Sequence, residues 1–131
     1  NLFQLCIIDS VRRTCLCQNE KIDSIDQSPF DKVAQLKLIQ FSNTQLERFE
    51  KINLQNQERS LFGLIIEKPT YSSSSSFELD NNTFYSLFNL ELLTLSNLGI
   101  KHLDALQLTN LIRLKELNLN GNNLESLDFL E

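Results

Sequence analysis

Segment 111–127, LIRLKELNLNGNNLESL, decides the fold because segment 87–103, LFNLELLTLSNLGIKHL, repeats its pattern of apolar residues. The first positions of the two segments differ by 111 − 87 = 24 residues. Their shared pattern is L-x-x-L-x-x-L-x-L-x-x-(N/L)-x-(L/I)-x-x-L. Apolar residues that recur at a fixed period indicate a repeat architecture, in which each unit is one supersecondary element.

The core of this pattern, L-x-x-L-x-L-x-x-N-x-L at a period of about 20 to 29 residues, is typical of leucine-rich repeats. Each repeat has an apolar face that it cannot bury alone, so neighbouring repeats stack into a solenoid. The sequence therefore predicts an α/β solenoid: a right-handed leucine-rich-repeat superhelix with one parallel sheet.

Two earlier segments extend the pattern to about four repeats. Segment 33–49 fits every apolar position, and segment 61–71 fits fewer of them. Successive strand centres are displaced by 25, 29 and 24 residues, and we attribute the longest step to an insertion at the serine run 72–76. The predicted strands are centred on Gln40, Ile65, Thr94 and Asn118.

Leucine at every third position also suits amphipathic helices, which are the alternative to strands here. The Leu-x-Leu pair in each segment, such as Leu93 with Leu95, instead requires the alternating faces of a strand. Gly121, within an Asn-rich stretch, would also break a helix. We therefore favour strands.

The composition argues against several classes of partner. The 131 residues include 12 Lys and Arg against 17 Asp and Glu, for a formal net charge of −5. This acidic balance provides no basic stripe for nucleic acid or an anionic membrane. No apolar run reaches the roughly 18 residues of a membrane span. The chain begins at Asn1 rather than Met, which we interpret as processing or trimming.

Three cysteines, Cys6, Cys15 and Cys17, lie within the first seventeen residues, and none follows. We interpret residues 1–32 as an N-terminal cap that shields the open end of the repeats at 33–131. Clustered cysteines suit an oxidising compartment, so we expect a secreted protein. The alternative is a metal site that combines these thiolates with His102, but C-x-C without a second close pair is a weak zinc signal.

The sequence C-x-C followed by Ile22 and Ser24 resembles the cysteine cap of extracellular leucine-rich-repeat proteins. The sequence Cys6-x2-Asp9, then Cys15-x-Cys17, together with the motif Asn43-Thr44-Gln45-Leu46, is similar to small secreted arthropod members. Ser24 stands where the fourth cysteine of that cap would be. The resemblance implies that Cys6 bonds Cys17 and that Cys15 is left without a partner. A free, exposed Cys15 would offer a route to a covalent dimer.

One position of the repeat is occupied by asparagine in the last unit only. A buried Asn122 is expected to hydrogen-bond the backbone of the loop that leaves the strand. Thr44 can replace part of this function in the first unit, whereas Pro69 and Leu98 cannot. Asn97, one place earlier, is expected to compensate for Leu98.

The sequence contains one glycosylation sequon, Asn81-Asn82-Thr83. A glycan on Asn81 would hang from the loops and leave the strand residues open. No catalytic arrangement is found, because His102 lies between apolar positions with no motif around it. We therefore expect neither an enzyme nor a cofactor.

The remaining function is recognition of another protein. Side chains that alternate with the buried leucines face the concave side of the sheet, where apolar residues among polar ones indicate a contact surface. They form three columns: Leu38, Gly63, Leu92 and Glu116; Gln40, Ile65, Thr94 and Asn118; Ser42, Glu67, Ser96 and Asn120.

The alternative function is that of a structural or accessory subunit in a larger assembly. A four-stranded face would offer only a few hundred Å², against roughly 800 Å² per partner in a standard interface. The last repeat would also expose an apolar edge at Leu127, Phe129 and Leu130. We expect either association through this edge or a longer solenoid of which the chain is a fragment.

Overall fold

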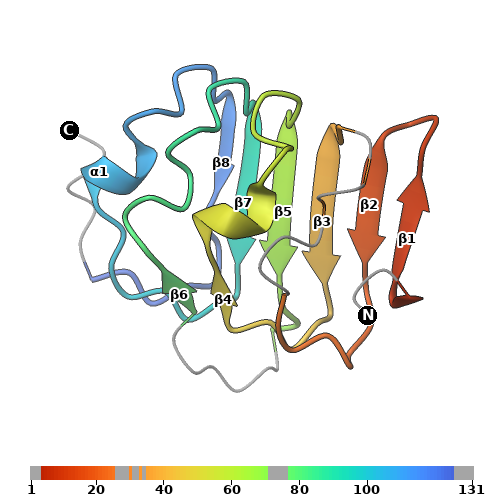
Figure 1. Cartoon of the computed structure of the whole chain (residues 1–131). Helices are drawn as coiled ribbons and strands as arrows, with labels where there is room; N and C mark the ends of the chain where they lie inside the picture. Colours follow the sequence, from red (N-terminus) through yellow and green to blue (C-terminus); the bar gives the residue numbers. More distant parts are fainter. Residues whose placement is uncertain (1–3, 26–29, 31–32, 34, 71–76, 126–131) are drawn as a thin grey trace.

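The computed structural model describes residues 4–25, 30, 33, 35–70 and 77–125. The chain forms a β-solenoid of about four turns with a parallel sheet, and its main strands lie side by side in sequence order (Figure 1). The repeat strands are β3 (Leu38–Ser42), β5 (Gly63–Glu67), β7 (Leu92–Ser96) and β8 (Glu116–Asn118).

The register of the sheet matches the repeat spacing residue by residue. Gln40 pairs with Ile65, Ile65 with Thr94, and Thr94 with Asn118, all in parallel strands. The four strand centres predicted from the sequence are therefore confirmed. The serine run 72–76, to which the longer third step was attributed, lies outside the described residues.

The main sheet has six strands, two more than the repeats supply. The additional strands are β1 (Cys6–Asp9) and β2 (Thr14–Cys17), which form an antiparallel hairpin. β2 pairs in parallel with β3, so the N-terminal region extends the sheet instead of only covering its end. The expected boundary between residues 32 and 33 stays a prediction.

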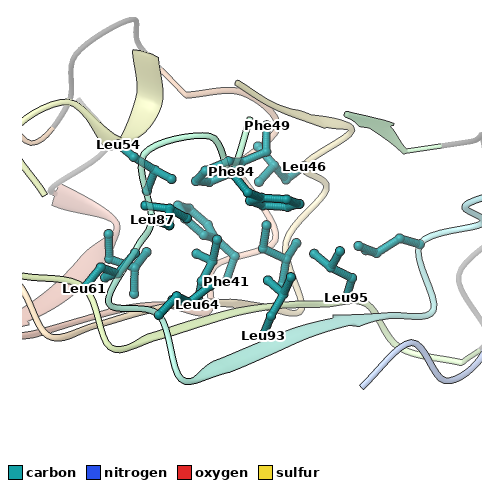
Figure 2. Close-up of a cluster of buried hydrophobic side chains, with 14 of the residues drawn as sticks. Phe41, Leu46, Phe49, Leu54, Leu61, Leu64, Phe84, Leu87, Leu93 and Leu95 are labelled. Atoms are coloured by element: carbon teal, nitrogen blue, oxygen red, sulfur yellow. The ribbon is translucent and has the colours of Figure 1, made fainter. Parts of the chain in front are cut away.

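The core lies between this sheet and a layer of short elements opposite it. Strand side chains that point inward, such as Ile39, Leu64 and Leu93, are completely buried. Figure 2 shows leucines and phenylalanines from both layers filling the space between them. The rings of Phe41 and Phe49 meet edge to face, with centroids 6.0 Å apart and planes at 71°, which is a favoured aromatic geometry.

The opposite layer contains little helix. It includes a two-stranded sheet of β4 (Arg48–Phe49) and β6 (Glu78–Leu79), the 3₁₀ turn η2 (Lys51–Leu54) and the four-residue helix α1 (Ala105–Leu108). The α/β class expected from the repeat pattern is therefore not confirmed, whereas the solenoid and its parallel sheet are.

Asn122 ties the last two described turns together. Its Nδ2 donates to the carbonyl oxygens of Leu95 and Leu119, at 2.5 and 3.0 Å. Its Oδ1 accepts from the backbone N–H groups of Leu98 and Ile100, at 3.0 and 3.2 Å. The expected contact with the loop backbone is confirmed, and it reaches the preceding turn as well.

The other turns use different groups at this place. Asn97 donates from Nδ2 to the carbonyl of Lys68 at 2.9 Å, in agreement with its expected compensating role. Thr44 Oγ1 accepts from the backbone N–H of Leu46 at 3.4 Å. Each side chain offers fewer hydrogen bonds than Asn122, so these turns depend more on packing.

One residue in each of three turns adopts a left-handed conformation. The φ angles are +56° at Asn43, +60° at Asn97 and +74° at Gly121. Asparagine and glycine tolerate this region better than other residues. A Cβ added to Gly121 would also collide with the side-chain amide of Asn97.

Replacing Gly121 by Ala should lower the free energy of unfolding by about 1–3 kcal/mol, because alanine is strained at positive φ. Gly63→Ala is the matched control: its φ is not positive, and the atom nearest to the added Cβ would be the flexible side-chain end of Leu38. Urea titration with an unchanged m-value measures both. An equal loss in the two variants would contradict the left-handed turn.

Replacing Asn122 by Ala should lower the free energy of unfolding by about 2–3 kcal/mol, because backbone groups of two turns lose a partner. Asn123→Ala is the control, since the exposed Asn123 contributes only its backbone N–H to the hydrogen bonds described. Similar urea midpoints for the two variants would show that Asn122 does not hold the turns together.

Candidate concave recognition face

The concave face is formed by the strand side chains that point away from the core. The three predicted columns match the observed register across β3, β5, β7 and β8, apart from Asn120, which follows the last strand. Ser42, Thr94 and Ser96 are almost covered, with exposed fractions of 7%, 8% and 6%. Gly63 is buried as well. The accessible surface comes from the other eight members: Leu38, Gln40, Ile65, Glu67, Leu92, Glu116, Asn118 and Asn120.

The hairpin β1–β2 adds residues to two of the predicted columns, and the sequence analysis did not predict these residues. Thr14 pairs with Leu38, and Leu16 pairs with Gln40. Ile7 lies opposite Leu16 and is 68% exposed. The alternation of Cys15 and Cys17 with Leu16 was a signal for this strand, because it places both cysteines on the inner side.

A hollow of about 400 Å³ opens on this face at Gly63. Leu38 and Leu92 flank the glycine from the neighbouring strands. A Cβ at Gly63 would lie 2.8 Å from Leu38 Cδ1 and 3.7 Å from Leu92 Cδ2. Leu38 and Leu92 thus lean over the glycine from both sides, and the floor of the hollow is apolar. Six residues line the hollow: Lys37, Leu38, Phe62, Gly63, Glu91 and Leu92.

The rim of the hollow combines an aromatic ring with charged groups. Phe62, which was not predicted from the sequence as a site residue, has a large apolar side chain that is 42% exposed. Glu91 forms an ion pair with Lys115 at 2.8 Å. Lys37 lies at the rim as well. The site thus has an apolar floor and a polar margin, an arrangement common in binding pockets.

The opposite end of the strands is polar and ordered by hydrogen bonds. Gln40 Nε2 donates to Ser42 Oγ at 2.9 Å, and Ser42 Oγ donates to Glu67 Oε1 at 3.1 Å. This chain fixes the carboxylate of Glu67 on the concave side. The hollow at Gly63 and the carboxylate of Glu67 therefore lie at opposite ends of β5.

A larger hollow, of about 480 Å³, lies away from this face, between β4, β6 and the turn at Ile100–His102. Its margin is occupied by paired charges, since Arg48 contacts Glu50 at 3.1 Å and Glu78 at 3.4 Å. His102 is 77% exposed and lies 3.8 Å from Glu125. Exposed ion pairs of this kind contribute little energy, and their arrangement offers no nucleophile next to a base.

The sulfur atoms of Cys6 and Cys17 lie at disulfide distance, which agrees with the pairing that the resemblance implied. The thiol of Cys15 is buried and lies 3.7 Å from Cys17 Sγ. Among the described residues, the sulfur atoms of these three cysteines lie close enough together to be considered as metal ligands, within 4.8 Å of one another. His102, which the alternative metal site would use, does not belong to this group. A covalent dimer through Cys15 would require an exposed thiol, whereas the thiol of Cys15 is buried in this structure.

Burial raises the pKa of the Cys15 thiol to about 11. Only the thiolate reacts with iodoacetamide, so Cys15 should resist alkylation at pH 7.5 and react once urea unfolds the chain. Raising the pH toward 11 should increase the rate in the folded state. Mass spectrometry measures this, and rapid labelling of the folded chain at pH 7.5 would contradict the burial of Cys15.

Asn81 is exposed in the turn that follows β6. The hydroxyl of Thr83 is buried and donates to the Phe49 carbonyl at 3.2 Å and to Asp80 Oδ1 at 3.0 Å. A glycan on Asn81 would extend from the layer opposite the main sheet. Glycosylation stays a prediction.

The residues proposed for edge association, Leu127, Phe129 and Leu130, lie outside the described part of the chain. Within that part, no helix is both long and apolar enough to cross a membrane.

A scan against protein-family models found no match for the chain, and neither did a search of curated proteins. The protein is therefore a β-solenoid whose first hairpin carries the cysteines, and its concave face is the candidate functional site.

Proposed function

We propose that this chain is an extracellular protein of leucine-rich-repeat type that recognises another protein through the concave face of its main sheet. The observation that carries the proposal is the apolar hollow at Gly63, between Leu38 and Leu92. Apolar surface in a concavity gains free energy when a partner removes it from water. The proposed role is binding without catalysis.

The repeat class and the location have separate support. The Leu-x-Leu spacing and the hydrogen bonds of Asn122 are features that leucine-rich repeats share, and the cysteine pattern of the N-terminal region resembles the cap of secreted arthropod members. The cysteine pair at disulfide distance is compatible with an oxidising, extracellular environment.

The size of the face suits a narrow ligand. Six strands about 4.8 Å apart span roughly 24 Å, and strands of five residues are about 16 Å long, which gives a face of about 400 Å². A standard interface buries roughly 800 Å² per partner. The face alone is therefore suited to a single segment of a partner chain, with further contacts at the rims near Ile7 and Phe62.

An Ile65→Arg substitution tests the proposal at the centre of the face, with Ile112→Arg as control, because Ile112 is 74% exposed and lies outside the columns. Each immobilised protein is exposed to extracellular fluid from the source organism, and retained proteins are quantified by mass spectrometry. We expect a partner that the native chain and the control retain but that Ile65→Arg loses at least about tenfold. Equal retention by all three would contradict recognition through this face.

The second candidate, an accessory subunit that associates through its last described strand, is favoured by Leu117. This core-facing residue of β8 is 37% exposed, whereas its counterparts Leu93 and Leu64 are completely buried. Light scattering measures the molar mass of the native chain and of Leu117→Asp. A native assembly that the substitution dissociates would support this role, and a monomer in both cases would exclude it.

A further inference from the structure

We propose that the ligand of the concave face is an extended segment that places an apolar side chain in the hollow at Gly63 and a Lys or Arg side chain, about four residues away, on Glu67. This inference rests on the proposed function and specifies the chemistry of the partner. It follows from the apolar hollow, the charges of the face and the distance between the two ends of β5.

The hollow selects an apolar side chain. Its floor is formed by Leu38, Gly63 and Leu92, and the ring of Phe62 borders it. Of the two charged groups at its rim, Glu91 is already paired with Lys115. An aliphatic or aromatic side chain would pack against this apolar floor and remove it from water. A polar side chain there would lose hydrogen bonds to water without replacement.

The charges of the face select a cation. Among the described residues of the three columns, the ionisable side chains are Asp9, Glu67 and Glu116, all of them acidic. Asp9 is occupied locally: its Oδ1 accepts from the backbone N–H groups of Val11 and Arg12, at 3.0 and 2.9 Å. Glu116 lies in the column of Gly63, at the end of the strands that carries the hollow.

Glu67 is the carboxylate best placed to bind a ligand. It is half-buried, and the hydroxyl of Ser42 holds its Oε1 at 3.1 Å. In the described part of the chain, no Lys or Arg forms an ion pair with it. A fixed, partly desolvated carboxylate forms a stronger charge-assisted hydrogen bond than a freely rotating one, because less side-chain entropy is lost on binding.

The geometry of β5 sets the spacing of the ligand residues. Gly63, Ile65 and Glu67 alternate with buried residues and therefore share the concave side. A strand rises about 3.3 Å per residue, so the two ends are separated by about 13 Å. An extended ligand that runs along β5 has the same rise, and its apolar and basic side chains must be about four positions apart. The side chain between them would lie over Ile65.

A phage-displayed library of random twelve-residue peptides tests this inference on the full chain. We expect selection to enrich peptides with an apolar residue and a Lys or Arg four positions apart, in either order. A synthetic peptide with the enriched sequence is then titrated by calorimetry. Glu67→Gln should weaken its binding at least about threefold, and more at low salt than at high salt.

Gly63→Ala should weaken binding of the same peptide about tenfold, because the added methyl group would displace Leu38 Cδ1 and change the shape of the hollow. The substitution is expected to leave the urea midpoint unchanged or higher, so that lost binding cannot be ascribed to unfolding. Glu20→Gln is the charge control and should change affinity less than twofold, because the exposed Glu20 lies outside the columns of the concave face.

Two further outcomes separate this inference from the proposed function. Peptides that lose binding with Ile65→Arg but lack the spaced pair, or ignore Glu67→Gln, would overturn the inference and leave recognition through the concave face intact. Peptides that bind Ile65→Arg as well as the native chain would overturn both.

Discussion

The stacking of successive turns in register is the constraint on which the rest of this structure depends. No single turn can bury its own leucines, so each strand must align with the next at the spacing of a parallel sheet. This alignment places Ile39, Leu64 and Leu93 above one another in the core. The same alignment sets the concave side, because the residues between the buried ones must point outward. Core and candidate site are therefore two results of one register.

The strands could be predicted closely from the sequence because their apolar spacing is local. The Leu-x-Leu pair fixes both the position of a strand and the side that it buries, and the predicted centres at Gln40, Ile65, Thr94 and Asn118 pair as expected. The function of Asn122 could be predicted for a related reason: a side-chain amide after a buried strand is placed to satisfy the turn backbone.

Other features depend on contacts between distant segments and could not be predicted. The pairing of β2 with β3 brings Cys15 beside Ile39, and no repeat pattern marks that hairpin. The layer opposite the sheet follows no strict pattern either, and buried polar groups complete it: Gln57, completely buried, accepts from the Leu36 N–H at 2.6 Å and donates to the Phe30 carbonyl at 3.2 Å. The hollow at Gly63 is visible only once Leu38 and Leu92 are placed on either side of it.

The most direct test of this account is a nuclear Overhauser experiment on selectively methyl-labelled leucines of the native chain. Leu38 Cδ1 and Leu92 Cδ2 both approach the point that a Cβ on Gly63 would occupy, at 2.8 and 3.7 Å. We predict a cross-peak between these two methyl groups, although 92 − 38 = 54 positions separate them in the sequence. A complete set of assigned methyl signals without this cross-peak would contradict both the register and the hollow.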